Sequence, residues 1–182
     1  MINTVKDLRC VLDNSIKKSS NVFIVGHNEP DFDAIGSAIG LQVYAKNIGK
    51  KAYIVVEDTD LEPGVKKIIE ENKNKYHIIR LSEFVNMKDK KSLLILTDVN
   101  KGYMISVKNH LDSVGNIIII DHHRPDDKTV KTKNTYINLE TSSASEVVAK
   151  LLQGTKNMFY DAQVANYLLS GIILDTQRFS KN

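Results

Sequence analysis

Two apolar runs, SLLILTDV (residues 92–99) and NIIIIDHH (residues 116–123), decide the fold of this 182-residue chain. Each run is rich in leucine or β-branched residues without a polar alternation, which is typical of a strand covered on both faces. Such strands occur in parallel sheets that carry helices on both sides. Both runs end in acidic or imidazole side chains. They predict an α/β protein with polar groups at the carboxyl ends of its strands.

The segments around these runs alternate between strand-like and helix-like patterns. Three further strands are expected at residues 22–26, 52–56 and 76–80, and residues 102–111 are expected to form a weak helix or turn. Helices are expected within residues 1–20, at 34–48, from Pro63, from Ser143 and at 160–174. The alternation predicts a mainly parallel five-stranded sheet with helices on both faces, in one domain over residues 1–182.

The composition favours a folded protein in a reducing compartment. A hydrophobic content of 42% is enough for a buried core, and the net charge of +3 is what a solvated surface with scattered lysines gives. The single cysteine, Cys10, excludes a disulfide framework and is expected as a small core residue of the first helix. No apolar run reaches the roughly 20 residues of a membrane span. We therefore expect a cytoplasmic chain without membrane contact of its own.

Acidic and imidazole side chains follow three of the expected strands. HNEPDFD (residues 27–33) follows the first, Asp98 closes the fourth, and residues 121–123 (DHH) close the fifth, while Asp175 ends the last expected helix. Taken singly, each residue has an ordinary explanation as a turn former, a helix cap or a structural histidine. Because the carboxyl ends of parallel strands meet at one edge, we expect them to converge. Several charges in one crevice are costly unless cations lie between them.

The ligand chemistry and the spacing favour two cations. Carboxylate and imidazole groups without thiolate suit manganese, magnesium, iron or zinc. Asp31 and Asp33 lie two residues apart on what we expect to be an extended loop, so their side chains can turn toward different neighbours. One ion can take His27 and Asp31 and the other Asp33, with Asp98 as a bridge. Two ions about 3.5–4 Å apart can clamp a displacement at phosphorus.

Four motifs, in family order, resemble those of the DHH phosphoesterases. Residues 121–123 resemble the motif that names the family, and GHNEPDFDAIG (26–36), TDVN (97–100) and GIILDTQRF (171–179) resemble its first, second and fourth motifs. The resemblance covers nearly the whole chain and implies the DHH-domain fold. Within the family, the DHHRP and SSASE segments are most similar to the cyclic-di-AMP phosphodiesterases of the GdpP type.

The resemblance implies a role for each matching side chain. Two manganese ions are implied, for which magnesium, cobalt or iron can substitute. The first ion would be held by His27, Asp31 and Asp98, and the second by Asp33, Asp98, His122 and Asp175. The catalytic group would comprise Asp98, Asp121, His122 and His123, with Asp121 orienting His122. Candidate contacts to the substrate phosphate are His123, Arg124, Ser142 and Ser143.

The implied reaction is the hydrolysis of cyclic di-AMP to pApA, by attack of a metal-activated hydroxide on a 3′–5′ phosphodiester. Three alternatives remain open: a short-oligonucleotide exoribonuclease, a manganese pyrophosphatase, and a non-catalytic module that binds a nucleotide. The expected partner is a small nucleotide rather than duplex nucleic acid, because there is no basic stripe interleaved with aromatic residues and no tryptophan. A homodimer is compatible with the sequence.

Two departures from the family pattern affect substrate binding. Lys101-Gly102-Tyr103 stands where the subgroup usually carries an Arg-Pro-Ser-like stretch. The C-terminal DHH-associated domain, which grips the substrate in the family, is not in this chain, and neither are the membrane segments that tether many GdpP-type proteins to the inner face of the membrane. We expect an isolated core of this kind to hydrolyse its substrate weakly, because positioning carries much of the rate.

Overall fold

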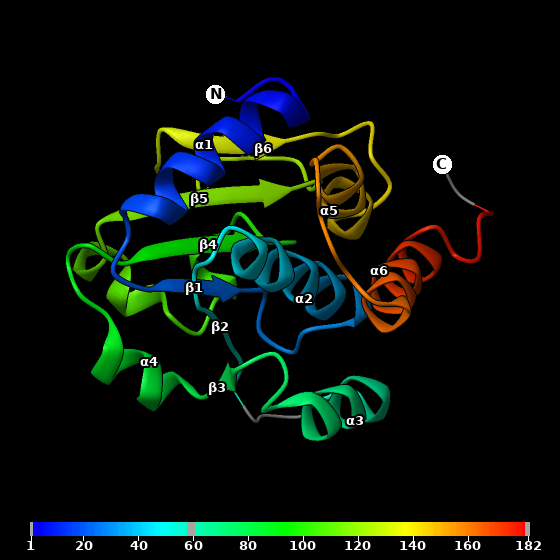
Figure 1. The fold of residues 1–182 in the computed structure, drawn as a ribbon, viewed down its shortest axis with the longest axis horizontal. Coiled ribbons are helices and arrows are strands. Elements are labelled where there is room, and N and C mark those ends of the chain that lie inside the picture. Colours follow the sequence, from blue (N-terminus) through cyan, green and yellow to red (C-terminus); the bar gives the residue numbers. More distant parts are fainter. Residues whose placement is uncertain (1, 58–60, 181–182) are drawn as a thin grey trace.

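Six parallel strands form the central sheet of the protein (Figure 1). The structure is a computed structural model and describes residues 2–57 and 61–180. The strands are β1 (Val22–Val25), β2 (Ala52–Val55), β3 (Ile78–Ile79), β4 (Leu93–Thr97), β5 (Asn116–Asp121) and β6 (Asn134–Ile137). They follow the order β3-β2-β1-β4-β5-β6, and each neighbouring pair is parallel. The predicted α/β class and parallel sheet are confirmed, with six strands in place of five.

The strand that the sequence pattern missed is β6, at the edge of the sheet. Its sequence, NTYI, lacks the continuous apolar character of the inner strands, and Tyr136 is its only buried residue. An edge strand has one paired neighbour and one free side, so it needs fewer apolar residues than a central strand. Strand β6 pairs with β5 from Asn134 opposite Ile118 to Ile137 opposite Asp121.

The helices agree with the expected positions, with one addition. They are α1 (Val5–Lys18), α2 (Phe32–Asn47), α3 (Pro63–Asn72), α4 (Leu81–Met87), α5 (Ala144–Gln153) and α6 (Ala162–Asp175). Helix α4 was not predicted because its seven residues are too few to show a helical period. Residues 102–111, expected as a weak helix or turn, lie in two short 3₁₀ segments, η1 (Gly102–Met104) and η2 (Lys108–Ser113).

The two faces of the sheet are covered by different layers. Alternate residues of β1 point to opposite sides: Ile24 packs under α1, α2 and α5, whereas Phe23 packs toward α4 and the segment that holds η1 and η2. Figure 1 shows α2 lying across the sheet, with α5 and α6 beside it. The hydrophobic cluster under α1, α2 and α5 also includes buried residues of α3 and α6. Helices α2, α5 and α6 together carry or support three acidic candidates of the site.

Close helix packing in this layer depends on two glycines. A Cβ atom on Gly36 of α2 would lie 2.6 Å from the backbone oxygen of Tyr167 in α6. A Cβ atom on Gly171 of α6 would lie 2.4 Å from Oγ of Ser145 and 2.8 Å from Cα of Asp33. Because neither position has room for a side chain, glycine at both lets α6 approach α2 and α5.

The prediction that Cys10 is a core residue is wrong. Cys10 is exposed rather than part of the core, because the buried face of α1 consists of Leu8, Leu12 and Ile16. Among the described residues, no helix combines the length and the apolar character needed to cross a membrane. The expectation of a further, substrate-gripping domain outside this chain stays a prediction.

The order of the strands locates the functional edge. Chain connections run outward in one direction from β1 to β2 and β3, and in the other from β4 to β5 and β6. In open parallel sheets, ligands bind at the carboxyl ends of the strands where this direction reverses. Here the reversal falls between β1 and β4, whose last residues are followed by His27 and Asp98.

Candidate metal centre

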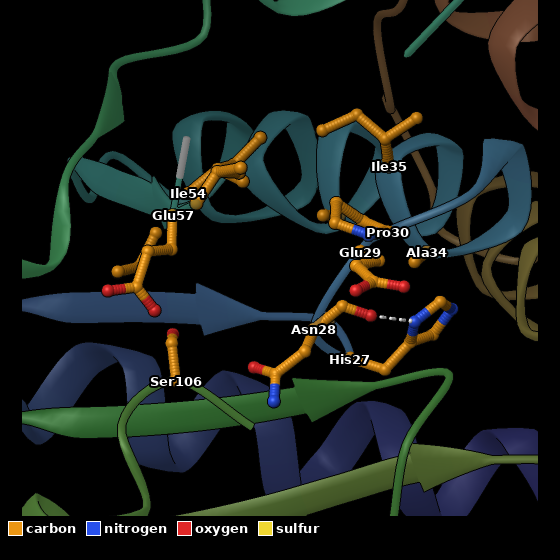
Figure 2. Close-up of a pocket in the computed structure, with 13 residues that line it drawn as sticks. His27, Asn28, Glu29, Pro30, Ala34, Ile35, Ile54, Glu57 and Ser106 are labelled. Atoms are coloured by element: carbon orange, nitrogen blue, oxygen red, sulfur yellow. Dashed lines mark hydrogen bonds between the residues drawn. The ribbon is translucent and has the colours of Figure 1, made fainter. Parts of the chain in front are cut away.

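The loop after β1 presents His27 in one orientation. Its Nδ1 atom donates a hydrogen bond to the backbone oxygen of Asn28 at 2.7 Å, as Figure 2 shows. The Nε2 atom is thereby left to face Asp98 Oδ2 at 3.5 Å and Asp31 Oδ1 at 3.8 Å. A histidine whose Nδ1 hydrogen is held by a carbonyl can bind a cation through Nε2 once that nitrogen has released its proton.

Asp31 and Asp33 lie at the start of α2, not on the extended loop that we expected. Asp31 caps the helix, because its Oδ1 accepts hydrogen bonds from the amides of Asp33 and Ala34 at 2.8 and 3.0 Å. Asp33 is therefore in the first helical turn. The expected divergence still occurs: Asp31 faces His27, whereas Asp33 turns toward α5 and α6.

The N-terminus of α5 holds the carboxylate of Asp33. The amides of Ala144 and Ser145 each donate to one of its oxygens at 2.7 Å. The two backbone donors and the positive end of the helix dipole favour the ionised form of this fully buried side chain and offset part of the cost of its burial. The hydroxyl groups of Ser142 and Ser143 are engaged in local hydrogen bonds. Ser143 Oγ accepts from the Glu146 amide, and the Ser142 hydroxyl donates to the Glu146 carboxylate.

Asp98 occupies the centre of the site in an uncommon backbone conformation. Its φ angle is +57°, in the left-handed region that few residues other than glycine, asparagine and aspartate adopt. The side chain is only 3% exposed. Its two oxygens face different histidines: Oδ2 lies 3.5 Å from His27 Nε2, and Oδ1 lies 3.3 Å from His122 Nε2. One carboxylate thus stands between two imidazoles.

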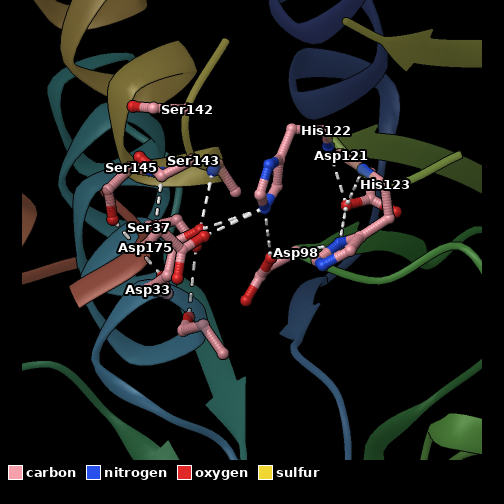
Figure 3. A network of polar contacts seen from close by, with 12 residues as sticks. Asp33, Ser37, Asp98, Asp121, His122, His123, Ser142, Ser143, Ser145 and Asp175 are labelled. Atoms are coloured by element: carbon pink, nitrogen blue, oxygen red, sulfur yellow. Dashed lines mark hydrogen bonds and ion pairs between the residues drawn. The ribbon is translucent and has the colours of Figure 1, made fainter. Parts of the chain in front are cut away.

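The Asp121-His122-His123 turn is held by hydrogen bonds to Asp121. Its Oδ1 accepts from the amides of both histidines at 2.8 and 3.2 Å, and from Nδ1 of His123 at 2.9 Å. Asp121 therefore contacts His122 through the main chain and His123 through the ring. The ring of His122 is left to point toward Asp98 and Asp175 (Figure 3).

Asn100 also shapes this turn, although the sequence analysis assigned it no role. Its side chain is 1% exposed and donates to Asp121 Oδ2 at 2.6 Å and to the His123 backbone oxygen at 3.0 Å. Its Oδ1 accepts from the Thr129 hydroxyl at 3.2 Å. The only signal in the sequence was the position of Asn100 just after Asp98, within TDVN.

Asp175 completes the cluster from the end of α6. Its Oδ2 lies 3.1 Å from His122 Nε2, and Asp33 Oδ2 lies 3.8 Å from the same atom (Figure 3). In three groups, ligand atoms lie within 4.8 Å of one another: His27, Asp31 and Asp98; Asp33, Asp98, His122 and Asp175; and Asp98, Asp121, His122 and His123. The structure thus brings together all six side chains that were predicted as ligands, and Asp98 belongs to every group.

The crowding of carboxylates shifts the pKa values of the site. Burial, reinforced by the charge of Asp98, raises the pKa of Asp33 to about 8. Burial alone would lower the pKa of His122, but its contacts with Asp175 and Asp98 outweigh this effect and raise it to about 10. His27 responds in the same way to Asp31 and Asp98, and its pKa rises to about 11. Without cations, these three side chains therefore retain protons that reduce the repulsion between the carboxylates of the site.

Two buried atoms test whether these residues fit a metal. Oδ1 of Asp98 and Nε2 of His122 are shielded from solvent and lie 3.3 Å apart, but neither makes a well-directed hydrogen bond within the described residues. Leaving a buried polar atom unpaired costs about 1–3 kcal/mol, so a partner that the polypeptide does not supply is expected there. Both atoms are metal donors and face the same space. The donor set of imidazole nitrogen and carboxylate oxygen fits a divalent cation.

A cavity opens beside the cluster. It has a volume of about 340 Å³ and is large enough for a small organic ligand. The wall contains the candidate phosphate contacts His123 and Arg124 next to the carboxylates. Ser142 and Ser143 do not line it. Its wall also includes His27 and residues from the segment after β4, among them Tyr103 and Met104.

The parallel sheet thus gathers acidic and imidazole side chains at its switch point, an arrangement suited to binding divalent cations. The family model "DHH family, N-terminal domain" matches residues 21–172, and the chain belongs to the DHH family. The resemblance stated from the motifs is thereby confirmed.

Individual relatives agree with this assignment. The chain is 33% identical over 175 residues to the cyclic-di-AMP phosphodiesterase PdeA of Listeria monocytogenes, covering 93% of this chain and 27% of PdeA. It is 33% identical over 161 residues to a probable manganese-dependent inorganic pyrophosphatase of Streptococcus thermophilus, covering 86% of this chain and 48% of that protein. The chain thus spans about a quarter of the length of PdeA.

A solved structure shares the fold. The crystal structure of an exopolyphosphatase-related protein from Bacteroides fragilis superposes with a TM-score of 0.75 at 24% identity. The alignment covers 96% of this chain and 52% of that one. The sheet and its helical layers therefore form a fold that is also found in this solved structure.

Proposed function

We propose that this chain is the catalytic domain of a two-cation phosphodiesterase that opens cyclic di-AMP to linear pApA. The observation that carries the proposal is the pair of unpaired buried atoms, Asp98 Oδ1 and His122 Nε2, at the centre of converging carboxylates. The similarity to PdeA supports the substrate class, and the similarity to a manganese-dependent pyrophosphatase supports manganese as the metal.

Two of the ligand groups correspond to two ions that share Asp98. The first ion would be held by His27, Asp31 and Asp98, and the second by Asp33, Asp98, His122 and Asp175. Each oxygen of Asp98 faces a different histidine, which is what a bridging carboxylate requires. Bound divalent cations would supply charge to neutralise the phosphoryl oxygens and would acidify the attacking water.

His123 is placed to donate a proton to the substrate. Its hydrogen bond to Asp121 raises its pKa, so the ring tends to carry hydrogen on both nitrogens. Nδ1 is held by Asp121, and 56% of the side chain is exposed at the cavity. Nε2 then donates to a phosphoryl oxygen or to the departing ribose 3′ oxygen. Arg124, beside it, offers a planar guanidinium that suits a phosphate.

The proposed substrate is small because the cavity is small. A volume of about 340 Å³ accommodates roughly one nucleotide beside the cluster, so further contacts to a dinucleotide come from outside this cavity. We include a C-terminal substrate-gripping domain in the proposal for the full-length protein. Without it, the chain is expected to turn over slowly but to remain dependent on divalent cations.

The experiment incubates the 182-residue chain with cyclic di-AMP and Mn²⁺ and separates the products by chromatography. The expected product is pApA, formed only when the cation is present. Parallel reactions contain pApA, a short RNA and pyrophosphate, so that exoribonuclease and pyrophosphatase activities are measured with the same protein. Release of orthophosphate from pyrophosphate at a higher kcat/KM than cleavage of cyclic di-AMP would favour the pyrophosphatase.

A matched variant guards against contaminating activity. Asp175→Asn removes one carboxylate charge with almost no change of volume, at a position that is 19% exposed at the side chain. The proposal requires that this variant loses turnover while it keeps its circular dichroism spectrum. If the chain binds cyclic di-AMP but neither the wild type nor an extended protein cleaves any of the four substrates, the chain is a binding module instead.

A further inference from the structure

Tyr103 is an exposed aromatic side chain in the wall of the catalytic cavity. It is 57% exposed, and it lines the same cavity as Asp98, His123 and Arg124. The neighbouring Met104, also in the wall, is 38% exposed. A large apolar surface beside a cluster of charges has no partner in the described part of the fold that would bury it, so it is available to a flat, partly apolar ligand.

The backbone on both sides of Tyr103 is fixed to the metal centre. The backbone oxygen of Met104 accepts a hydrogen bond from the Asn28 amide at 2.6 Å, next to His27. On the other side, Lys101 forms an antiparallel bridge with Thr129, and the Gly102 amide donates to the Lys128 oxygen. Segment η1 is therefore anchored both to the first ligand loop and to the segment after the Asp121-His122-His123 turn.

The charges around the ring favour stacking over ion pairing. Lys128 Nζ lies 5.5 Å from the centroid of the Tyr103 ring, close enough for a cation–π contact on one face. Lys101 is already neutralised, because its Nζ lies 2.6 Å from Asp126 and also donates to the Arg124 backbone oxygen. In η1, the exposed ring of Tyr103 therefore lines the cavity with the Lys128 ammonium over one of its faces.

We propose that Tyr103 is the platform on which the base of the bound nucleotide stacks while its phosphate lies at the carboxylate cluster. This inference rests on the proposed function and adds a specificity residue to it. The ligand class is a purine nucleotide. Its large π surface stacks on the tyrosine, and its phosphate reaches Arg124 in the wall of the same cavity. Base stacking on an aromatic side chain depends little on hydrogen bonding, so Tyr103 selects for the presence of a base.

The test uses cyclic di-AMP in which one adenine is replaced by 2-aminopurine, whose fluorescence is quenched when it stacks. Binding is followed by stopped flow with Mg²⁺, in the phase before turnover, for the wild type, Tyr103→Ala and Tyr103→Phe. Loss of the aromatic ring is expected to weaken binding about 10- to 100-fold and to abolish the quenching. Tyr103→Phe is expected to restore both, since it keeps the ring. Phe159→Ala is the control, because Phe159 is 78% exposed but lines a different cavity.

A second readout separates stacking from a merely structural role. KM is compared for cyclic di-AMP and for its cyclic abasic analogue, and Tyr103→Ala should raise the first far more than the second. An equal rise for both substrates, or unchanged quenching in Tyr103→Ala, would overturn the inference while the proposed hydrolysis stands. If no protein cleaves either substrate, the proposed function fails, and the fluorescence measurement alone then decides whether Tyr103 stacks a base.

Discussion

His122 Nε2 lies 3.1 Å from Oδ2 of Asp175, so the turn after β5 meets the end of the last helix, α6. We predict that Asp175→Asn lowers the affinity for Mn²⁺ and the rate of phosphodiester cleavage by at least about 100-fold, because it removes one of the charges around His122. The fold should survive, since the amide has the same shape. Isothermal titration with Mn²⁺ measures the affinity, and thermal unfolding is the control. Unchanged turnover would remove Asp175 from the site.

The left-handed backbone of Asp98 distinguishes two substitutions there. Asn adopts this conformation readily, whereas Ala loses about 1 kcal/mol or more to the strain of a positive φ angle. Both variants should lose cation binding and turnover, but only Asp98→Ala should also lose stability from backbone strain. Chemical denaturation in the presence of a chelator compares the two, because the cation contribution is then absent. Equal stability of both variants would argue against strain at Asp98.

Asn100 should act through the residues that it holds. Asn100→Ala removes the hydrogen bonds to Asp121 and to the His123 backbone, so we predict a fall of about 10- to 100-fold in cation affinity or turnover. The matched control is Asn47→Ala, which removes hydrogen bonds to Val43 and Phe159 on the side of α2 away from the cluster. If both substitutions reduce stability equally and neither changes the pH profile of cleavage, Asn100 is only structural.

The space around Gly171 predicts a stability effect that reaches the site. Gly171→Ala places a methyl group 2.4 Å from Ser145 Oγ and 2.8 Å from Asp33, and overpacking of this kind typically costs about 1–3 kcal/mol. Because Asp33 must shift, cation affinity should fall as well. Gly102→Ala is the control, since its Cβ would meet Val130 at an ordinary 3.5 Å. Thermal unfolding with and without Mg²⁺ measures both effects, and an unchanged melting temperature in Gly171→Ala would contradict the packing.

The stability of the cation-free protein should fall as the pH rises from about 6.5 to 8.5. The pKa values of His27 and His122 are raised to about 11 and about 10, so their stabilising contribution is complete below 6.5 and is lost as the pH rises through the folded values. The raised pKa of Asp33, about 8, acts in the same direction, because the folded state retains a proton that the unfolded chain releases near 3.8.

Melting curves in a chelator between these pH values test this prediction, and the same series with Mg²⁺ should show a smaller decline because the cations replace the protons. Asp98 opposes the trend only in acid: burial would raise its pKa, but its contacts with His122 and His27 outweigh burial and lower it, so its contribution is lost at low pH. A melting temperature in chelator that stays constant or rises across this range would contradict the prediction. It would show that the charges of the cluster compensate one another without cations.

Most of the fold was predictable because the inner strands are buried on both faces. A strand such as β4, with all five residues buried, must be apolar throughout, and this leaves a plain pattern in the sequence. Strand β6 and helix α4 left no such pattern in the sequence. Tyr136 alone anchors β6 in the core, and α4 buries only Phe84, so neither repeats an apolar position often enough to show a period.

The convergence of the ligand candidates followed from one rule, but their detailed contacts did not. Because parallel strands end at one edge, His27, Asp98 and His122 could be brought together from the sequence alone. Nothing in the sequence indicated that the amides of α5 would hold the buried carboxylate of Asp33, since Asp33 and Ala144 lie 111 residues apart in the chain. The left-handed backbone of Asp98 also depends on its surroundings and has no local signal.

The side chains that gather at the sheet edge enter the chain early and late, from His27 near the first strand to Asp175 at the end of α6. During synthesis, a nascent polypeptide that has emerged only as far as β5 holds the early carboxylates without the last one. The proposed cation site is therefore complete only after α6 has left the ribosome and docked. Uptake of the proposed ions would then mark the completion of folding, and a product that terminates before Asp175 lacks one of the proposed ligands.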